Sequence, residues 1–502
     1  MSSFLNDSKL EIYFNKQLRI FSIIKKYNDQ IMSSLDIKAK PSENEEQSTW
    51  KLILFSTGYF LNTYLMIAFN NYVWTFYEGE LGLINTISLW PIYMALANTI
   101  YTIWSMLTNP FIGYLTDKPF KWTKRWGFHT PWVILGGIPA IVLFFFIFIP
   151  PITSGALLVL IYYIVIVSIY DLFYSLLQTH SYGAFAAHFR GDKMRRKGGL
   201  LTQIFTFLAN FLAITIFSQI INPGDPVSFT IAAFISIIIL AISLFFFIPG
   251  SKESKLIKDR FIGGYENVER VSFFKTMKMA LKEKNFMLVI ISYFSFMIAL
   301  GLMSMNAVNF VDDVLREEQY IRSIGSFLML ISSFITMPIW LRVAKKIGHS
   351  TTYSMGLAFF GVSLLLHLFI INALQYYILN ILMGMSGALF LIMLSPVTAD
   401  CYDEIAVKTK KHHETTLLGI RNFFIRITIP IQSFIIAIIH AITFYDPNEA
   451  SHGGEIIMGL RIIQGVVPFI FCIAGALIFY RWFDLKGDKK NEINKKLHEL
   501  KL

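Results

Sequence analysis

The sequence predicts an all-α membrane protein with 12 transmembrane helices in two six-helix bundles and with both termini in the cytoplasm. Three observations lead to this prediction. Hydrophobic residues make up 55% of the chain and charged residues only 15%, whereas a soluble domain carries about 25% charged residues. Apolar stretches of about 20 residues recur, and each is long enough to cross a bilayer as a helix. The basic residues gather in alternate loops between these stretches.

The apolar stretches fall into two sets, separated by the longest polar connection between spans. Backbone groups within lipid must hydrogen-bond to one another, so each stretch is expected to be a helix. The first six spans are expected at 51–76, 84–115, 132–150, 156–186, 200–221 and 227–249. The second six are expected at 286–310, 321–344, 351–371, 373–397, 416–443 and 457–482.

The distribution of Lys and Arg predicts the orientation. The loop between the second and third spans carries four of them, the loop between the fourth and fifth spans carries five, and the central loop carries nine. Of the connections on the other side, 1–2, 3–4, 5–6, 9–10 and 11–12 carry none, and the 7–8 loop carries Arg316 and Arg322 beside four acidic residues. Basic loops stay in the cytoplasm, so the alternation indicates an even number of spans.

These signals divide the chain into five parts. Apolar residues at helical spacing in the N-terminal part, among them Leu10, Phe14 and Leu18, indicate an amphipathic helix on the inner leaflet, with a partly disordered tail as the alternative. The parts are an N-terminal extension at 1–50, a first bundle at 51–249, a central loop at 250–284, a second bundle at 285–483 and a cytoplasmic tail at 484–502.

The composition also excludes several classes of protein. The net charge of +11 is explained by the cytoplasmic loops lying next to anionic lipid, and not by nucleic-acid binding. No phosphate-binding loop of the GxxxxGK[ST] type and no nucleophile with a neighbouring base is found, so we expect neither an enzyme nor a cofactor. The two cysteines specify no metal site or disulfide.

Four blocks of the sequence form a recognisable pattern. The first runs from Ile103 to Pro110 and continues through the basic hairpin with Arg125-Trp126-Gly127 to Pro131-Trp132, and another is Ala399-Asp400-Cys401-Tyr402-Asp403-Glu404 with Lys408 and Glu414. The other two are Ser181-Tyr182-Gly183-Ala184, and Tyr445-Asp446-Pro447-Asn448 followed by residues 480–488. These blocks resemble the glycoside–pentoside–hexuronide:cation symporters, the melibiose-carrier-like branch of the major facilitator superfamily; the first two are fairly specific and the other two support the match. The resemblance implies the major facilitator fold and a sugar or glycoside site between the two bundles, near the middle of the membrane.

The chain departs from this family at the coupling-cation site. The resemblance places that site on the second span, where the family has two carboxylates four residues apart. Here those positions are Ser105 and Asn109, and a ligating amide between them is Thr108. These residues keep oxygen or amide ligands but carry no negative charge, and none of them titrates. We therefore expect sodium coupling to be lost, leaving proton coupling or facilitated diffusion.

The sugar site likewise has neutral residues at positions where the family has charged ones. The resemblance places two acids of the family at Thr63 and Gln178, and an arginine at Gln203. By the same resemblance, an aromatic residue of the family is kept as Tyr174, and a sugar-stacking tryptophan of the family corresponds to Tyr182. A lysine of the family corresponds to Arg426, and Asn422 lies one turn before it. The residues predicted to line the site are Asn62, Thr63, Asn70, Tyr174, Gln178, Tyr182, Gln203, Asn422 and Arg426.

Asp171 is the only carboxylate expected deep within a span. A charged residue in a membrane is a functional candidate and faces a partner or water. Arg421 and Arg426 are its candidate partners. One interpretation is a pair that substrate or a proton disturbs, and the other is a static pair that fixes the two halves together. A cytoplasmic gate is predicted at Asp117, Arg125, Asp400 and Asp403.

The expected function is secondary transport of a sugar or glycoside by alternating access. The predicted protein is a monomer in the plasma membrane whose partners are a small-molecule substrate, membrane lipid and H⁺. A lysolipid transporter of the same fold is one alternative, because neutral residues in place of the sugar-binding acids also suit an amphiphile. A non-transporting membrane sensor, with the N-terminal extension as its output element, is another.

Overall fold

The computed structural model describes residues 49–81, 83, 87, 89–116, 120–188, 192–222, 224–255, 257–258, 273–409, 414–446 and 452–500. Residues 47–502 form one compact unit. The predicted amphipathic N-terminal helix lies outside the described residues. Within them the secondary structure is helical, as expected for a chain whose backbone groups must be paired inside lipid.

The first bundle contains six long helices with short helical segments between them. Asp225 caps the last of these helices by accepting a hydrogen bond from the backbone N–H of Val227 at 3.0 Å, and Pro226 opens it. The elements are α2 (Thr49–Ala68), η1 (Phe69–Val73), η2 (Phe76–Glu80), α3 (Trp90–Thr116), α4 (Thr123–Trp126), α5 (Thr130–Ile147), η4 (Ile152–Ser154), α6 (Ala156–His188), α7 (Asp192–Ile220) and α8 (Pro226–Ser251).

The second bundle repeats the plan after the short helix α10 (Phe273–Ala280). Three of its spans contain or end in a π-helical or 3₁₀ segment. The elements are α11 (Lys284–Met305), α12 (Ala307–Asn309), η5 (Phe310–Leu315), α13 (Tyr320–Ile347), α14 (His349–Leu365), η6 (Leu366–Leu368), α15 (Ala373–Thr409), α16 (Glu414–Arg426), α17 (Thr428–Thr443), α18 (Gly454–Arg461), η7 (Ile462–Val466), α19 (Val467–Trp482) and α20 (Gly487–Leu500).

Eleven of the twelve predicted spans correspond to helices that are long and apolar enough to cross a membrane, among the residues described. The remaining prediction, at 84–115, corresponds to α3, which is not one of the eleven. Its 27 residues give it a length of about 40 Å, so its length suffices. Polar residues such as Asn98, Thr102 and Ser105 lower its hydropathy, and α3 is covered by α6 and α17.

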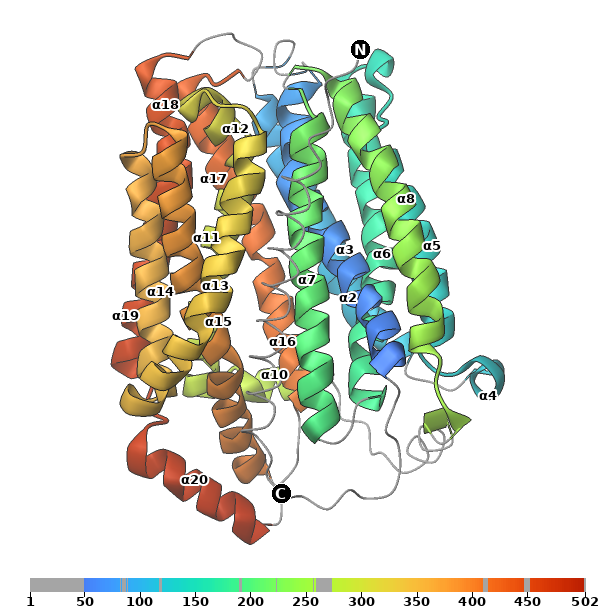
Figure 1. Ribbon diagram of the computed structural model, residues 1–502, viewed down its shortest axis with the longest axis vertical. Coiled ribbons are helices and arrows are strands. Elements are labelled where there is room, and N and C mark those ends of the chain that lie inside the picture. Colours follow the sequence, from blue (N-terminus) through green and yellow to red (C-terminus); the bar gives the residue numbers. More distant parts are fainter. Residues whose placement is uncertain are drawn as a thin grey trace, which may run out of the picture. The chain divides into compact units, whose positions relative to one another are not determined.

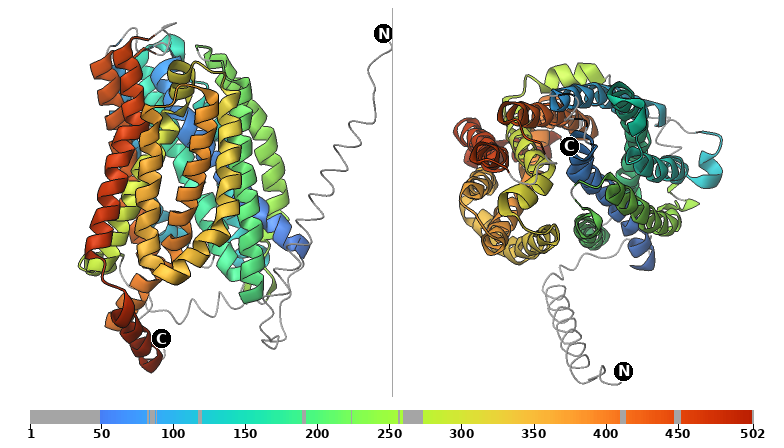
Figure 2. Two further views of the ribbon diagram at one scale, coloured as in Figure 1. Left: turned by 60° about the vertical axis from the view of Figure 1, so that its left-hand side comes forward. Right: turned by 90° about the horizontal axis from the view of Figure 1, so that it is seen from above.

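The helices of residues 47–502 form two groups that lie side by side when viewed along the helices (Figures 1 and 2). In the first group α2 packs against α7 and α8, and α5 packs against α6. In the second, α15 packs against α13 and α14, and α19 packs against α11 and α14. The groups meet where α3 packs against α17 and where α7 packs against α13. The site described below lies along these contacts.

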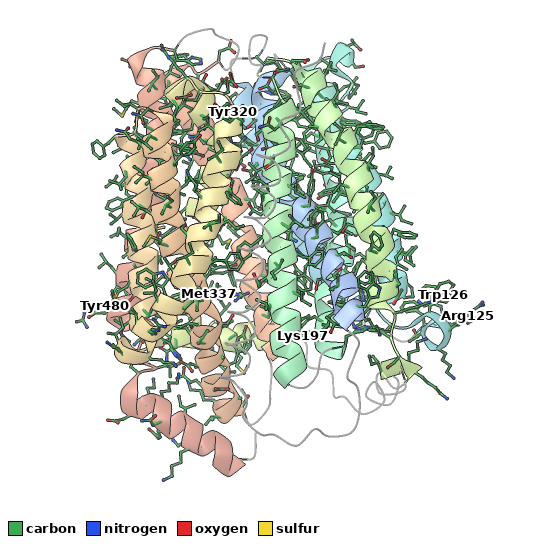
Figure 3. The ribbon with its side chains drawn as sticks, viewed as in Figure 1. Arg125, Trp126, Lys197, Tyr320, Met337 and Tyr480 are labelled. Carbon is green, nitrogen blue, oxygen red and sulfur yellow. The ribbon has the colours of Figure 1, made fainter. Side chains whose placement is uncertain are left out.

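The two ends of the unit carry different charges. Arg125, Trp126 and Lys197 lie at one end and Tyr320 at the other (Figure 3). We call the first the basic end and the second the far end. The basic end is the one that the Lys and Arg distribution assigns to the cytoplasm; this orientation stays a prediction.

The first resembling block has a structural role at the basic end. Gly127 ends α4 with φ +97°, and a Cβ atom there would collide with the Glu253 carboxylate. That carboxylate accepts hydrogen bonds from the backbone N–H groups of Phe128 and His129. Glycine is required here both for its positive φ and for the close approach. The turn after α4 is thereby tied to the chain that leaves α8.

The predicted tail at 484–502 contains a helix that the hydropathy pattern did not indicate. α20 packs against α15, and Lys490 pairs with Asp400 at 2.6 Å. Asp484 joins this helix to α11, because it pairs with Lys489 at 2.6 Å and accepts a hydrogen bond from Asn285 at 2.8 Å. The tail is thus attached to the second bundle.

Replacing Asp484 by asparagine is expected to release α20. Burial alone would raise the pKa of Asp484, but hydrogen bonds from Lys489 and Asn285 lower it to about 2. The stabilisation is therefore present above pH 3.8 and is lost only as the pH falls through about 2, so docking should not change between pH 5 and 8. Limited proteolysis of the tail should become severalfold faster in Asp484→Asn. It should stay unchanged in Asp488→Asn, whose carboxylate is exposed, and equal rates for the two variants would contradict the attachment.

Candidate functional site between the two bundles

A buried ion pair joins the two bundles at the middle of the long helices. Asp171 of α6 is 2% exposed, and its Oδ1 accepts a hydrogen bond from Nη1 of Arg426, on α16, at 3.2 Å. The Tyr101 hydroxyl, on α3, donates to the same oxygen at 3.2 Å. Arg426 also donates to Oγ of Ser105. Of the two arginines that the sequence suggested as partners, Arg426 is therefore the one that pairs with Asp171.

Three helices hold this group of side chains. α3 and α6 of the first bundle pack against each other, so Ser105 and Tyr101 face the same space as Asp171. α16 belongs to the second bundle and reaches α3 with its C-terminal end. A guanidinium held by a carboxylate and a hydroxyl in a water-poor setting is strongly favoured over the separated charges.

The surroundings of Asp171 keep some hydrogen-bonding capacity unused. Its second oxygen, Oδ2, is buried without a hydrogen-bond partner among the described residues, and so are the hydroxyls of Thr102 and Ser175. Thr102 adjoins Tyr101 on α3, and Ser175 lies one helical turn from Asp171 on α6. Buried polar groups without partners are rare in folded proteins, and they mark places where a ligand or water binds.

A second set of predicted site residues forms a chain of neutral hydrogen bonds from α6 to α2. The Gln178 amide donates to the Tyr174 hydroxyl at 2.9 Å, and that hydroxyl donates to the backbone carbonyl of Asn62 at 3.3 Å. The Asn62 amide donates to the carbonyl of Gly58 at 2.7 Å, while its own Oδ1 is buried without a partner among the described residues. The acceptor and donor groups of this chain suit a polyol.

The remaining predicted lining residues differ in exposure. Thr63 is buried in α2, whereas Asn70, Gln203 and Asn422 are exposed. Within the described residues, no hydrogen bond joins these three exposed side chains to the other predicted site residues. Tyr182 is 42% exposed and packs against Tyr59, with ring centroids 5.0 Å apart. The two rings present an aromatic surface next to the neutral chain on α6.

The predicted cation-site equivalents are partly placed. The Thr108 hydroxyl donates to the backbone carbonyl of Ser105 at 3.4 Å, and the Ser105 hydroxyl accepts from Arg426. The side chain of Asn109 lies outside the described part of the chain. The cationic group next to Ser105 is therefore a guanidinium that the protein itself supplies.

Arg421 does not pair with Asp171. Its guanidinium carbon lies 5.0 Å from the centroid of the Tyr293 ring, on α11, and its Nε is buried without a hydrogen-bond partner among the described residues. The sequence suggested both arginines as partners because both occupy the same span, and periodicity alone did not separate them. The structure places them in different environments.

Sequence analysis missed a buried acid–base pair that joins the bundles nearer the far end. Glu78 of η2 and His440 of α17 are 2.6 Å apart, with side-chain exposures of 2% and 1%. The His440 ring packs against Tyr445, whose hydroxyl donates to Asp313 at 2.6 Å, and His452 lies 3.1 Å from the same carboxylate. The available signal was the presence of Glu78 and Glu80 at the end of a span.

Acidic groups of η5 adjoin this pair. Burial, and then the charge of Asp313, raise the pKa of Asp312 from 3.8 to about 6. Burial likewise raises the pKa of Asp313, against the opposing effect of its hydrogen bond from Tyr445. The region therefore favours bound protons at acidic pH.

Further contacts join the bundles on the same side. Arg322 donates to the Asn71 side chain at 3.2 Å, and the hydroxyls of Ser218 and Ser323 form a hydrogen bond. Ser323 follows Tyr320, which marks the far end, by less than one helical turn (Figure 3). The Asn98 amide donates to Ser433 at 2.7 Å across the α3–α17 contact. These bonds hold the two bundles together at the far end.

The residues predicted to form a cytoplasmic gate have other neighbours. Asp400 pairs with Lys490 of α20, within the second bundle. Arg125 is exposed, and its guanidinium lies 6.0 Å from the Trp126 ring. Asp403 is partly buried in α15, and Asp117 lies outside the described residues. The partners of Arg125 and Asp400 thus lie within their own bundles.

His180 lies in an aromatic cluster at the basic end. Its Nδ1 is 3.1 Å from Nδ1 of His129, and its ring stacks on Trp132. Burial, and then the neighbouring His180 and His188, lower the pKa of His129 well below 6.5. A buried histidine in such a cluster contributes packing, and His180 lies nine residues further along α6 than Asp171.

Comparison with known proteins agrees with this architecture. The family model described as MFS/sugar transport protein matches residues 54–487. The sodium-dependent lysophosphatidylcholine symporter 1 of Gallus gallus is 20% identical over 462 residues, which are 84% of this chain and 85% of that protein.

Solved transporters share the fold. A variant of the peptide transporter POT in complex with alafosfalin has a TM-score of 0.56 and 14% identity, covering 89% of this chain and 94% of that one. A variant of the nucleoside transporter NupG has a TM-score of 0.56 and 12% identity, covering 87% and 100%. The helical architecture and the extent of the family match together place this chain in the MFS/sugar transport protein family of the major facilitator superfamily.

Proposed function

We propose that this transporter moves a sugar or glycoside by alternating access, without sodium coupling. The observation that carries the proposal is the buried Asp171–Arg426 pair, which joins the two bundles at the middle of their long helices. In alternating access two bundles rock about a fixed central site. A charged pair at that position changes its surroundings whenever the bundles move, so it can respond to a bound polar solute.

The contacts between the bundles support a state that opens toward the basic end. Glu78–His440, Arg322–Asn71 and Ser218–Ser323 close the far end. At the basic end the Arg125 carbonyl accepts a hydrogen bond from Lys258 of the central loop, and Asp400 pairs with Lys490 of α20, so neither contact joins the two bundles. If the basic end faces the cytoplasm, as the distribution of Lys and Arg predicts, the structure corresponds to an inward-facing state.

The neutral groups favour a polyol as the substrate. Asn62, Tyr174 and Gln178 offer amide and hydroxyl groups at the centre of the first bundle, and Tyr59 and Tyr182 add an aromatic surface. Sugars bind in this way, with hydroxyls bonded to amides and an apolar ring face against an aromatic ring. Residence in the plasma membrane, as a monomer, stays a prediction.

The position of Arg426 supports the proposed loss of sodium coupling. Its guanidinium already occupies the space next to Ser105 and Asp171, so a sodium ion would have to displace a fixed positive charge. Uptake of radiolabelled sugar into proteoliposomes is expected to be equal with and without an inward sodium gradient. A strong stimulation by sodium that Ser105→Ala abolishes would contradict the proposal, and Ser354→Ala, a buried serine of α14, is the control.

A lysolipid is the second candidate cargo, and one observation favours it. The Gallus gallus protein that resembles 84% of this chain is a lysophosphatidylcholine symporter. Neutral replacement of sugar-binding acids also suits an amphiphile. The two candidates are separated by uptake of a matched panel into the same proteoliposomes. Saturable uptake of glycosides with no uptake of lysolipids supports the first candidate, and the reverse result replaces it with the second.

A further inference from the structure

Three charged residues lie well inside the described spans near the centre of the molecule, and their charges do not cancel. Asp171 neutralises Arg426, since the two are paired at 3.2 Å. Arg421 lies five residues before Arg426 on α16, about 7.5 Å nearer the basic end along the helix axis. Its positive charge has no carboxylate partner among the described residues.

The guanidinium of Arg421 packs against an aromatic ring, but its hydrogen-bonding capacity is not satisfied. It lies over the Tyr293 ring at 5.0 Å, and its Nε is buried without a hydrogen-bond partner within the described structure. A ring face attracts a cation but accepts none of the five N–H groups of the guanidinium. A partly buried charge without a hydrogen-bonding counterpart is unfavourable, and in a membrane protein such a residue marks a substrate or ion pathway.

Two other arginines in the spans show how the fold treats an arginine that has only a structural role. Arg461 donates to the backbone carbonyls of His367 and Leu368 at 2.9 and 2.8 Å. Arg322 donates to the Asn71 side chain and also lies 5.0 Å from the Tyr72 ring. Among the described residues, Arg421 has the ring contact alone. Arg322 also has one nitrogen, Nη1, buried without a partner, but its guanidinium has an acceptor in Asn71, and Arg421 has no such acceptor within the described structure.

We propose that Arg421 binds an anionic group of the transported molecule: a carboxylate, sulfate or phosphate. The inference rests on the proposed transport function and specifies its substrate class. The planar fork of a guanidinium matches the two oxygens of such groups, and the Tyr293 ring fixes the orientation of the fork beforehand. The anion would then lie on the basic-end side of the Asp171–Arg426 pair, with the neutral part of the substrate against Asn62, Tyr174 and Gln178.

The anionic group has two possible sources, a charged glycoside or the phosphate of a lysolipid headgroup. The experiment uses pairs of compounds in which one member carries an anionic group that the other lacks. One arm compares a phenyl glucuronide with the phenyl glucoside, and the other compares lysophosphatidate with monoacylglycerol. Binding is measured by the thermal shift of the purified full-length protein, and uptake is measured in proteoliposomes. The pair that shows the preference identifies the source.

The anionic member of one pair is expected to bind at least about tenfold more tightly than the neutral member, as for a charge-assisted hydrogen bond. Arg421→Gln should abolish the preference, and Arg421→Lys, which keeps the charge but not the fork, should retain part of it. Arg342→Gln is the matched control, since Arg342 is exposed at the basic end of α13, and it should change nothing.

Equal binding of charged and neutral members by the wild-type protein would overturn the inference, and so would a preference that persists in Arg421→Gln. If Arg421→Gln does not fold, Arg421→Lys provides the test. An unchanged preference for the anionic compound in Arg421→Lys would exclude recognition through the planar fork of the guanidinium. Saturable uptake of a neutral solute without any charge preference would leave the transport proposal standing. Absence of uptake and of thermal shifts for every member of the panel would reject the transport proposal itself.

Discussion

Replacing Asp171 by asparagine is expected to abolish uptake and to destabilise the protein strongly. The change leaves the Arg426 guanidinium partly buried without its counter-charge, and removal of one member of a buried pair costs about 3–5 kcal/mol. Thermal unfolding of the purified variant, measured with its uptake in proteoliposomes, checks both effects. Thr443→Ala, a hydroxyl change near the far end of α17, serves as the control and should leave both nearly unchanged.

The double variant Asp171→Asn/Arg426→Gln decides between a working pair and a static one. Removing both charges restores electrical balance, so most of the lost stability should return. Uptake should stay absent if the pair takes part in transport. Recovery of full uptake together with stability would show that the pair only fixes the two bundles, and the proposed role of Asp171 would then be wrong.

Breaking the Glu78–His440 pair is expected to shift the protein away from the state that is closed at the far end. The pair is buried on both sides and connects the two bundles. His440→Ala removes one member of the pair, which costs about 3–5 kcal/mol. If the two residues separate when the far end opens, the substitution destabilises the closed state alone. A change of that size converts a closed population into a mostly open one.

The closed population of the far end should also depend on pH. The pKa of Asp312 is raised to about 6 in the closed arrangement. The stabilisation is therefore fully present below 3.8, the ordinary value, and is lost as the pH rises through about 6. Acidification from pH 7.5 to 5.5 should favour closure.

Distances between spin labels at Val227 and Glu455, both exposed in the first and second bundles, measure this equilibrium. The distance should lengthen in His440→Ala at every pH, and it should shorten on acidification of the wild-type protein. Val362→Ala, an exposed position of α14, is the control. A distance that neither the substitution nor the pH changes would contradict the role of this pair in closure.

The sequence predicted the features that local patterns specify. Eleven of the spans correspond to helices of the structure, because a stretch of about 20 apolar residues in lipid has few alternatives to a helix. It also singled out Asp171, since a carboxylate in an apolar stretch is conspicuous. It left the partner open, because Arg421 and Arg426 occupy the same span and the sequence pattern gave no reason to choose between them.

Other features depend on contacts between distant parts of the chain. Glu78 and His440 lie 362 positions apart, and neither has a local pattern that marks it as the partner of the other. α20 has few apolar residues and is held largely by ion pairs with α15 and with Asp484, so hydropathy did not indicate it. The site on α3 was predicted from the family resemblance, and the position of Arg426 beside Ser105 came only from the structure.

The polar composition of α3 has a consequence for how the protein is made. A nascent helix enters the membrane according to its own transfer free energy, and α3 falls below the hydropathy of the other eleven. Asn98, Tyr101 and Trp104 of α3 hydrogen-bond to residues of α6 and α17, which are synthesised later. α3 is therefore synthesised before its polar face can be covered. The helix must be retained at the translocon or beside α2 until α6 and α17 have been synthesised.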